Sequence, residues 1–183
     1  MVQNLKDILD RLEIWRKERG LAKSQGFEFD LNTQVSFLTE EITEYLRAKK
    51  DYERIDALCD LSVFSLNAIN GLDNNYDDLF SEIYHKAKRV NFYSIANIID
   101  RLPYMFRKGN DIKFNFMDVV EISRWIIEDM GYDYFKCMDE TLKEVESRKG
   151  AFNPESGKWE KFKDEESQKL WYKADYNSCK IVA

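Results

Sequence analysis

Proline and glycine are scarce in this chain, which has two prolines and seven glycines among its 183 residues. Because these residues are common in tight turns, the composition predicts few tight turns and a chain that is mostly helical. Histidine occurs once, and the three cysteines form no Cys-x-x-Cys pair. This pattern argues against a zinc site.

Long apolar runs are also missing, since none reaches the roughly 18 residues that a membrane-spanning helix requires. The N-terminal segment 1–15 is amphipathic and carries acids, unlike a signal peptide, so we expect a cytoplasmic protein. A net charge of −6 disfavours a general nucleic-acid binder, which needs a basic field.

The length favours one well-buried domain over residues 1–183, with residues 147–183 as a C-terminal extension. The expected fold class is all-α, a helical bundle. Apolar periodicity predicts helices over residues 3–19, 79–102, 116–130 and 133–149, besides two helices within residues 39–70. Asn32 or Thr33 is expected to cap the first of those two, and Asn115 with Asp118 to cap the helix that follows a turn or short hairpin at residues 104–114.

Residues 39–70 carry acids on both of their helical segments, which a short polar hinge at residues 49–52 joins. At roughly 100° per residue, Glu41 and Glu44 run along the edge of an apolar face, and Glu40 points further out. The second segment has no charge between Asp60 and Asp73, and a helix so apolar is expected to be buried on most sides.

Glu53, Asp56 and Asp60 nevertheless fall on one stripe of this second helix, with Asn67 further along it. Unpaired carboxylates in such a place cost on the order of several kcal/mol or take up protons, so they need cations.

If the two helices pack antiparallel, Glu41 and Glu44 face Asp56 and Asp60. This set of oxygen ligands suits Mg²⁺, or Mn²⁺, and Mg²⁺ usually completes its shell with water and substrate phosphates. The expected substrate therefore carries phosphates. The alternative is a set of solvated acids, or acids paired with Lys and Arg four residues away, on a non-catalytic helical interaction module.

The acids also resemble a known signature. Glu40-Glu41-x-x-Glu44, followed by Glu53-x-x-Asp56 and Asp56-Ala-Leu-Cys-Asp60, is similar to the EExxE…ExxD motif of the all-α nucleoside triphosphate pyrophosphohydrolases. That superfamily includes the MazG-like proteins, the dimeric dUTPases and phosphoribosyl-ATP pyrophosphohydrolase. The second half departs from the usual pattern, in which a Glu precedes the last Asp by three residues, because position 57 is Ala.

The Asp-Ala-Leu-x-Asp form resembles a MazG-like subgroup of phages and bacteria. This resemblance implies a MazG-like four-helix core and Mg²⁺ bound by carboxylates. It also implies cleavage of a nucleoside triphosphate between its α and β phosphates, giving a monophosphate and pyrophosphate. The expected metal ligands are Glu41, Glu44, Asp56 and Asp60, and Glu53 remains an alternative to Asp56. Glu40 or Glu41 is the expected base that takes a proton from the attacking water.

Further residues are expected to bind the substrate. By the same resemblance, the helix over 79–102 brings Lys86 and Asn91 to the phosphates, with His85 a weaker candidate. Trp15 can stack on a base or pack in the core. The runs Met138 to Gly150 and Gly157-Lys158-Trp159 resemble the C-terminal extension of that subgroup, and its Arg148, Lys158 and Lys161 can reach phosphates.

The predicted function is thus Mg²⁺-dependent hydrolysis of a nucleoside triphosphate. Phosphoribosyl-ATP and dUTP or dUDP are alternative substrates, because base selection depends on the shape of a pocket. Helices as apolar as residues 57–70 also predict self-association into a homodimer or homotetramer.

Overall fold

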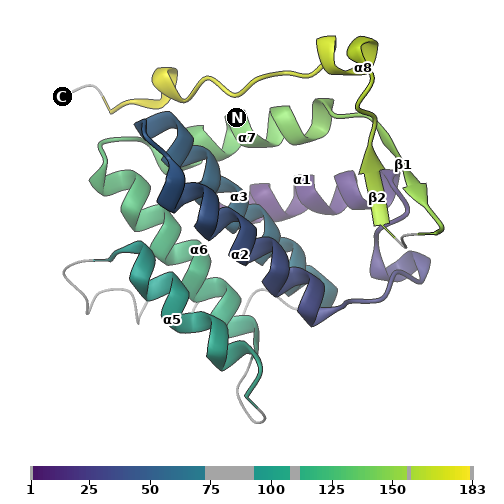
Figure 1. Ribbon diagram of the computed structural model, residues 1–183, viewed down its shortest axis with the longest axis horizontal. Helices are drawn as coiled ribbons and strands as arrows, with labels where there is room; N and C mark the ends of the chain where they lie inside the picture. The colour runs from purple at the N-terminus through teal and green to yellow at the C-terminus, as the bar shows by residue number, and fades with distance from the viewer. Residues whose placement is uncertain (1, 73–92, 108–111, 156–157, 182–183) are drawn as a thin grey trace.

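The computed structural model describes residues 2–72, 93–107, 112–155 and 158–181. Within these ranges the chain is mostly helical, with seven α-helices packed together and one small two-stranded hairpin near the C-terminus (Figure 1). The helices are α1 Leu5–Glu18, α2 Leu31–Arg47, α3 Asp51–Leu72, α5 Ile95–Met105, α6 Ile112–Asp129, α7 Tyr134–Ser147 and α8 Glu165–Lys169. The strands are β1 Gly150–Asn153 and β2 Lys158–Lys161, and the 3₁₀ turns are η1 Lys23–Gln25 and η3 Tyr176–Cys179.

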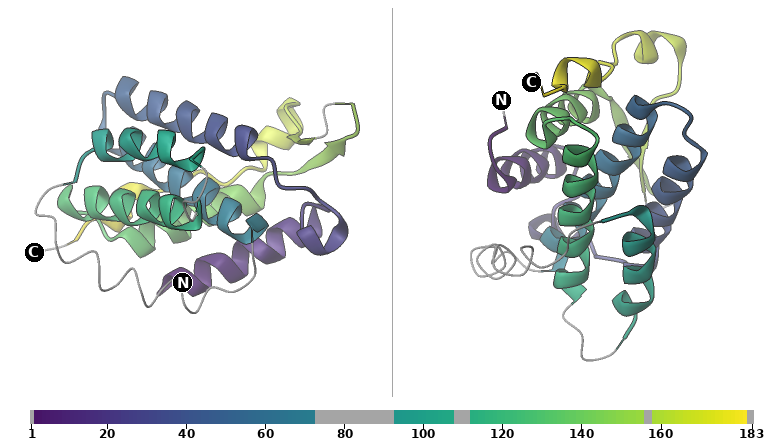
Figure 2. Two further views of the ribbon diagram at one scale, coloured as in Figure 1. Left: turned by 90° about the horizontal axis from the view of Figure 1, so that it is seen from below. Right: turned by 90° about the vertical axis from the view of Figure 1, so that its left-hand side faces the viewer.

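Helix α3 is the centre of the bundle, as its apolar sequence predicts. It packs against α1, α2, α6 and α7, and α5 lies beside α6 (Figure 2). Leu58, Leu61 and Leu66 of α3 have no exposed surface. Burying each of these side chains stabilises the fold by about 1.5–3 kcal/mol. The helix that carries Asp56 and Asp60 is therefore held from most sides.

Helices α2 and α3 form the antiparallel pair that the sequence predicts. Asp30 begins α2, because its carboxylate accepts a hydrogen bond of 2.9 Å from the Thr33 backbone nitrogen. The prediction that Asn32 or Thr33 caps this helix is therefore wrong by two or three residues. Phe37 of α2 and Phe64 of α3 stack with their ring centroids 4.8 Å apart, which fixes the register of the two helices.

The helix predicted over residues 79–102 is not continuous. Residues 73–92 lie outside the described residues, and Ser94 is extended before α5 begins at Ile95. The Ser94 backbone nitrogen donates a hydrogen bond of 2.8 Å to Asn97 Oδ1. This contact caps the N-terminus of the helix, and the apolar periodicity alone does not reveal it. Pro103 lies inside the last turn of α5, so the helix continues to Met105, beyond the predicted end at residue 102.

The next two predicted features also need correction. Residues 104–105 belong to α5 and residues 112–114 to α6, so the expected turn over 104–114 is shorter at both ends. Asn115 is buried inside α6 and does not cap it. The helix predicted over 133–149 is confirmed as α7, which Asp133 caps through the Lys136 backbone nitrogen at 3.1 Å.

The C-terminal extension departs from a purely helical fold. Strands β1 and β2 pair antiparallel, with Phe152 opposite Trp159. The Trp159 ring meets the edge of the Trp15 ring at 5.7 Å, which ties the hairpin to α1. Residues 171–181 then run along α7 (Figure 1). Among the described helices, none combines the length and the apolar composition needed to cross a bilayer.

Candidate functional site

A cleft of about 1570 Å³ is bordered by α1, α2, α3, the loop before α2 and the β1–β2 hairpin. It brings together eight residues that the sequence singles out: Trp15, Glu40, Glu41, Glu44, Asp56, Asp60, Arg148 and Lys161. Lys86, Asn91 and His85 lie outside the described residues. Lys158 is part of β2, but its side chain also lies outside the described part of the structure.

The acids come from facing turns of α2 and α3. Glu41 is only 9 % exposed, and burial, followed by the charges of Asp60 and Glu44, raises its pKa to about 9. Burial and then the charge of Asp56 raise the pKa of Asp60 to about 7. These shifts show that the ionised forms are poorly solvated and repel one another.

Within the described ranges, no cation forms an ion pair with these acids. None of the described ion pairs involves Glu41, Glu44, Asp56 or Asp60. Arg148 opposes the rise in the pKa of Asp60 through its charge, but its guanidinium pairs with Glu144. Among the described neighbours, the positive charge of Arg148 therefore compensates the cluster only in part.

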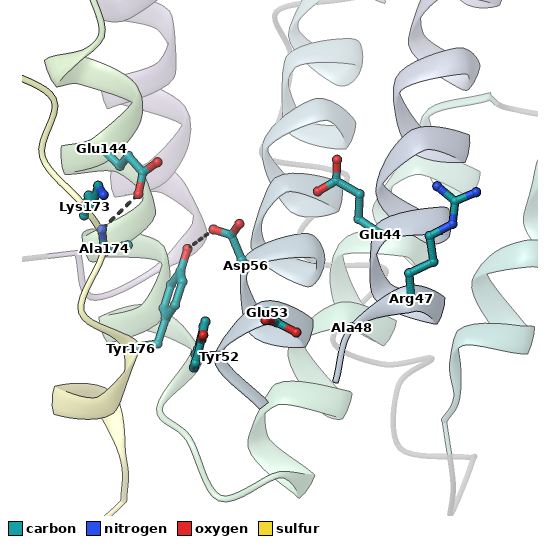
Figure 3. Close-up of a pocket in the computed structure, with 10 residues that line it drawn as sticks. All are labelled: Glu44, Arg47, Ala48, Tyr52, Glu53, Asp56, Glu144, Lys173, Ala174 and Tyr176. Atoms are coloured by element: carbon teal, nitrogen blue, oxygen red, sulfur yellow. Dashed lines mark hydrogen bonds between the residues drawn. The ribbon is translucent and has the colours of Figure 1, made fainter. Parts of the chain in front are cut away.

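A smaller pocket of about 480 Å³ adjoins the acids and opens between α2, α3, α7 and the C-terminal segment. Asp56 lies there between Glu144 on one side and Glu44 on the other (Figure 3). The Tyr176 hydroxyl donates 2.7 Å to Asp56 Oδ1. Burial raises the pKa of Asp56, and this hydrogen bond partly offsets the rise.

Sequence reasoning missed Glu144 and Tyr176 as parts of this site. Glu144 forms an ion pair with Arg148 and accepts a hydrogen bond of 2.9 Å from the Ala174 backbone nitrogen. It therefore holds the C-terminal segment against α7 beside the acids. The four-residue spacing of Glu144 and Arg148 was an available signal for their pairing. Tyr176 is 120 residues from Asp56, and no local pattern reveals that contact.

The Glu53 carboxylate faces the backbone of the turn between α2 and α3. Its Oε2 accepts hydrogen bonds from the backbone nitrogens of Lys49 at 2.7 Å and Lys50 at 3.1 Å. The bond to Lys49, with smaller contributions that include the bond to Lys50, lowers the pKa of Glu53. Glu53 thus closes the turn before α3, and Asp56 is the better candidate for a ligand. Glu40 is exposed at the rim of the cleft.

The donor set matches a hard divalent ion. Carboxylate oxygens from Glu41, Glu44, Asp56 and Asp60 are the ligands that Mg²⁺ and Mn²⁺ take. Glu41 is buried, Asp56 and Asp60 are partly buried, and Glu44 is exposed at the mouth of the site. In the described residues, however, no three acidic, histidine or cysteine side chains are gathered closely enough to hold a metal ion as they stand. To bind an ion, these carboxylates would therefore have to move closer together.

Trp15 lines the cleft, and its ring already contacts other residues of the protein. Its Nε1 donates 3.2 Å to the Val145 carbonyl, and the Arg19 guanidinium lies 4.6 Å from the ring centroid. With the Trp159 contact, these interactions favour its role in anchoring the hairpin over a role in stacking on a base. Lys161 is exposed, with Nζ 5.5 Å from the Trp171 ring centroid.

No protein-family model matches the chain, and no match was found among curated proteins or solved structures. The interpretation of the site therefore depends on its own residues.

Proposed function

We propose that this protein is a Mg²⁺-dependent nucleoside triphosphate pyrophosphohydrolase that gives a nucleoside monophosphate and pyrophosphate. The observation that carries the proposal is the group of poorly solvated acids on α2 and α3, which lines a cleft large enough for a nucleotide. A cleft that only displayed solvated acids would not raise the pKa of Glu41 to about 9.

Glu41, Glu44, Asp56 and Asp60 are the proposed ligands of Mg²⁺, with Mn²⁺ as a substitute. When bound, the ion supplies charge neutralisation for the phosphates and lowers the pKa of a coordinated water. Tyr176 holds the Asp56 carboxylate in one orientation through the hydrogen bond to Oδ1. An oriented ligand loses less entropy when the cation binds.

The other residues act on the phosphates and on the attacking water. Glu40 lies exposed at the rim and can accept a proton from a water that enters from the cleft, with Glu41 the alternative base. Arg148 and Lys161 border the same cleft and can offset the charge of the departing pyrophosphate. Arg148 is the better placed of the two, because its charge already acts on Asp60 and Asp56.

The same features favour membership of the MazG-like group. The Glu40-Glu41-x-x-Glu44 motif and the Asp56/Asp60 pair lie on adjacent antiparallel helices, the arrangement that the motif requires. The MazG-like four-helix core and the homodimer or homotetramer remain parts of this proposal.

A panel of common nucleoside triphosphates and deoxynucleoside triphosphates, including dUTP, with phosphoribosyl-ATP added, tests the function. We expect Mg²⁺-dependent release of pyrophosphate from at least one compound by the wild type. Glu44→Gln should lose it, because one ligand charge is gone. Asp100→Asn, at an exposed position of α5, should retain it. No release from any compound would remove the enzymatic proposal.

One observation favours a second candidate, a non-catalytic helical interaction module. The described acids are not gathered around one point as they stand, as expected if they never bind metal. Thermal stabilisation separates the two functions. A metal enzyme is stabilised by Mg²⁺, and Asp60→Asn removes the effect, whereas an interaction module shows no stabilisation by Mg²⁺.

A further inference from the structure

The antiparallel register of α2 and α3 orders the cleft into layers. Phe37 stacks on Phe64, and Asp60 exerts the strongest charge effect on Glu41. Glu41 is four residues after Phe37, and Asp60 is four residues before Phe64. In an antiparallel pair, one turn forward along α2 lies beside one turn back along α3. The acids therefore form one layer of the cleft, and the two phenylalanines form the next layer.

The third layer is made of amides. Gln34 is three residues before Phe37, Asn67 is three residues after Phe64, and both side chains line the cleft. Asn67 is two turns beyond Asp60, which is ~10 Å along the axis of α3. From one end to the other, the cleft therefore presents acids, then an aromatic pair, then side-chain amides.

The orientation of the Asn67 amide is fixed by Arg16. The Nη1 atom of the buried Arg16 side chain donates a hydrogen bond of 2.6 Å to Asn67 Oδ1. Because a guanidinium has only donors, the atom that it contacts must be the amide oxygen. The NH₂ group of Asn67 is left for another partner, and it forms no hydrogen bond within the described residues.

A second amide donor lies in the same part of the cleft. Asn70 borders the cleft and is 8 % exposed, and its Nδ2 is buried without a hydrogen-bond partner in the described part of the chain. Phe29 packs on Gly71 at the same end, where an added Cβ would lie 2.8 Å from the Phe29 ring. A buried donor without an acceptor is unfavourable, and a ligand acceptor would relieve it.

We infer that this aromatic and amide end of the cleft is a nucleobase subsite that selects bases with a keto oxygen at position 4 of a pyrimidine or position 6 of a purine, such as uracil, thymine and guanine. The inference rests on the proposed function, which places the phosphates at the acids. The base then lies against Phe37 and Phe64, and its edge meets the Asn67 NH₂ group. An amide donor pairs with a keto oxygen and not with the exocyclic amino group of adenine or cytosine.

Matched nucleotide pairs test the selection. Deoxyinosine and deoxyadenosine triphosphates differ at the 6 position of one purine, and the deoxyuridine and deoxycytidine compounds differ at the 4 position of one pyrimidine. We expect the keto member of each pair to have a kcat/KM at least about tenfold higher, since a polar site discriminates strongly against a mismatched partner.

Asn67→Asp is the informative variant. Its carboxylate keeps an acceptor for Arg16 but replaces the NH₂ donor with a second acceptor. We expect the preference to reverse toward the amino member of each pair, while Asn67→Ala loses the preference. Equal selectivity in the wild type and in both variants would overturn the subsite, even with hydrolysis intact.

Binding of the uncharged deoxynucleosides, measured by saturation-transfer NMR without metal, separates the subsite from the enzymatic function. Keto-selective binding that reverses in Asn67→Asp supports the subsite even if no triphosphate is hydrolysed. Nucleosides that bind without selectivity, or fail to bind, contradict it whatever the hydrolysis assay shows.

Discussion

The Tyr176 hydroxyl donates a hydrogen bond of 2.7 Å to Asp56 Oδ1, and it joins the C-terminal segment to the acids of α3. The Thr141 hydroxyl of α7 lies 2.9 Å from the same phenol oxygen. Tyr176 is buried, so this contact is shielded from solvent. The C-terminal segment therefore takes part in the candidate site and does more than cover α7.

Tyr176→Phe removes this hydroxyl and leaves the ring in place. We expect the affinity for Mg²⁺ to fall by about tenfold or more, because losing the partner that orients a metal ligand typically costs 10- to 100-fold. Isothermal titration with Mg²⁺ measures the change. Tyr172→Phe is the matched control, since its hydroxyl donates to Glu140 from the same segment. Equal Mg²⁺ affinities in the two variants would show that Tyr176 has a structural role only.

The raised pKa values of Glu41 and Asp60 predict how stability without metal depends on pH. Both groups hold protons more tightly in the folded protein than in the unfolded chain, so the folded state binds more protons between their ordinary and raised pKa values. The free energy of unfolding should then fall as the pH rises from about 4 to about 9, most steeply between about pH 4.5 and 7, where both groups contribute, and above pH 7 through Glu41 alone. Denaturant titrations at fixed ionic strength measure this slope.

Saturating Mg²⁺ should reduce that slope, because the cation favours the ionised carboxylates. Glu41→Gln should likewise raise stability at pH 8 without metal and weaken the effect of Mg²⁺. Glu53 gives a control of opposite sign, since its pKa is lowered and its contribution is lost as the pH falls. A wild-type stability that rises between pH 5 and 8 without metal would contradict the buried repulsion.

The α3 core should be sensitive to the removal of single side chains. Leu58 has no exposed surface, so we expect Leu58→Ala to lower the free energy of unfolding by about 2–5 kcal/mol. Leu46 on α2 is 61 % exposed, and Leu46→Ala should change stability by less than about 0.5 kcal/mol. Urea titrations of both variants check this contrast. Similar values would show that α3 is not the buried centre.

Gly150 should be essential for the β1–β2 hairpin. A Cβ at this position would collide with the Glu160 carbonyl and the Trp159 ring. We expect Gly150→Ala to speed amide hydrogen exchange in residues 150–153 and 158–161, with little change in α2 and α3. Ala151→Ser, at the exposed neighbouring position, is the control. Unchanged exchange in Gly150→Ala would show that the hairpin can adapt to a side chain there.

The sequence predicts the pairing of α2 with α3 well, because the apolar run after Asp60 has to be buried and the short hinge forces the helices antiparallel. The positions of single boundaries are harder to predict. Asp30 and Ser94 cap their helices through hydrogen bonds with the residue three positions further on, and the sequence makes neighbouring polar residues equally plausible as caps. Pro103 lies in the last turn of α5, and the helix continues for two residues beyond it. The position of the proline alone therefore does not predict where the helix ends.

Contacts distant in sequence could not be predicted. The Tyr176 contact with Asp56 and the Arg16 contact with Asn67 join residues 120 and 51 positions apart. The hairpin depends on Trp159 finding Trp15, again across most of the chain. The homodimer or homotetramer stays a prediction, which analytical ultracentrifugation of the full chain can check.

The position of phosphate cleavage tests the central claim most directly. A ³¹P NMR time course with Mg²⁺ and deoxyuridine triphosphate follows each product. We predict that deoxyuridine monophosphate and pyrophosphate appear in equal amounts in the wild type and not in Asp60→Asn. Diphosphate with free phosphate as products, or an unchanged substrate spectrum for every triphosphate tried, would contradict the account.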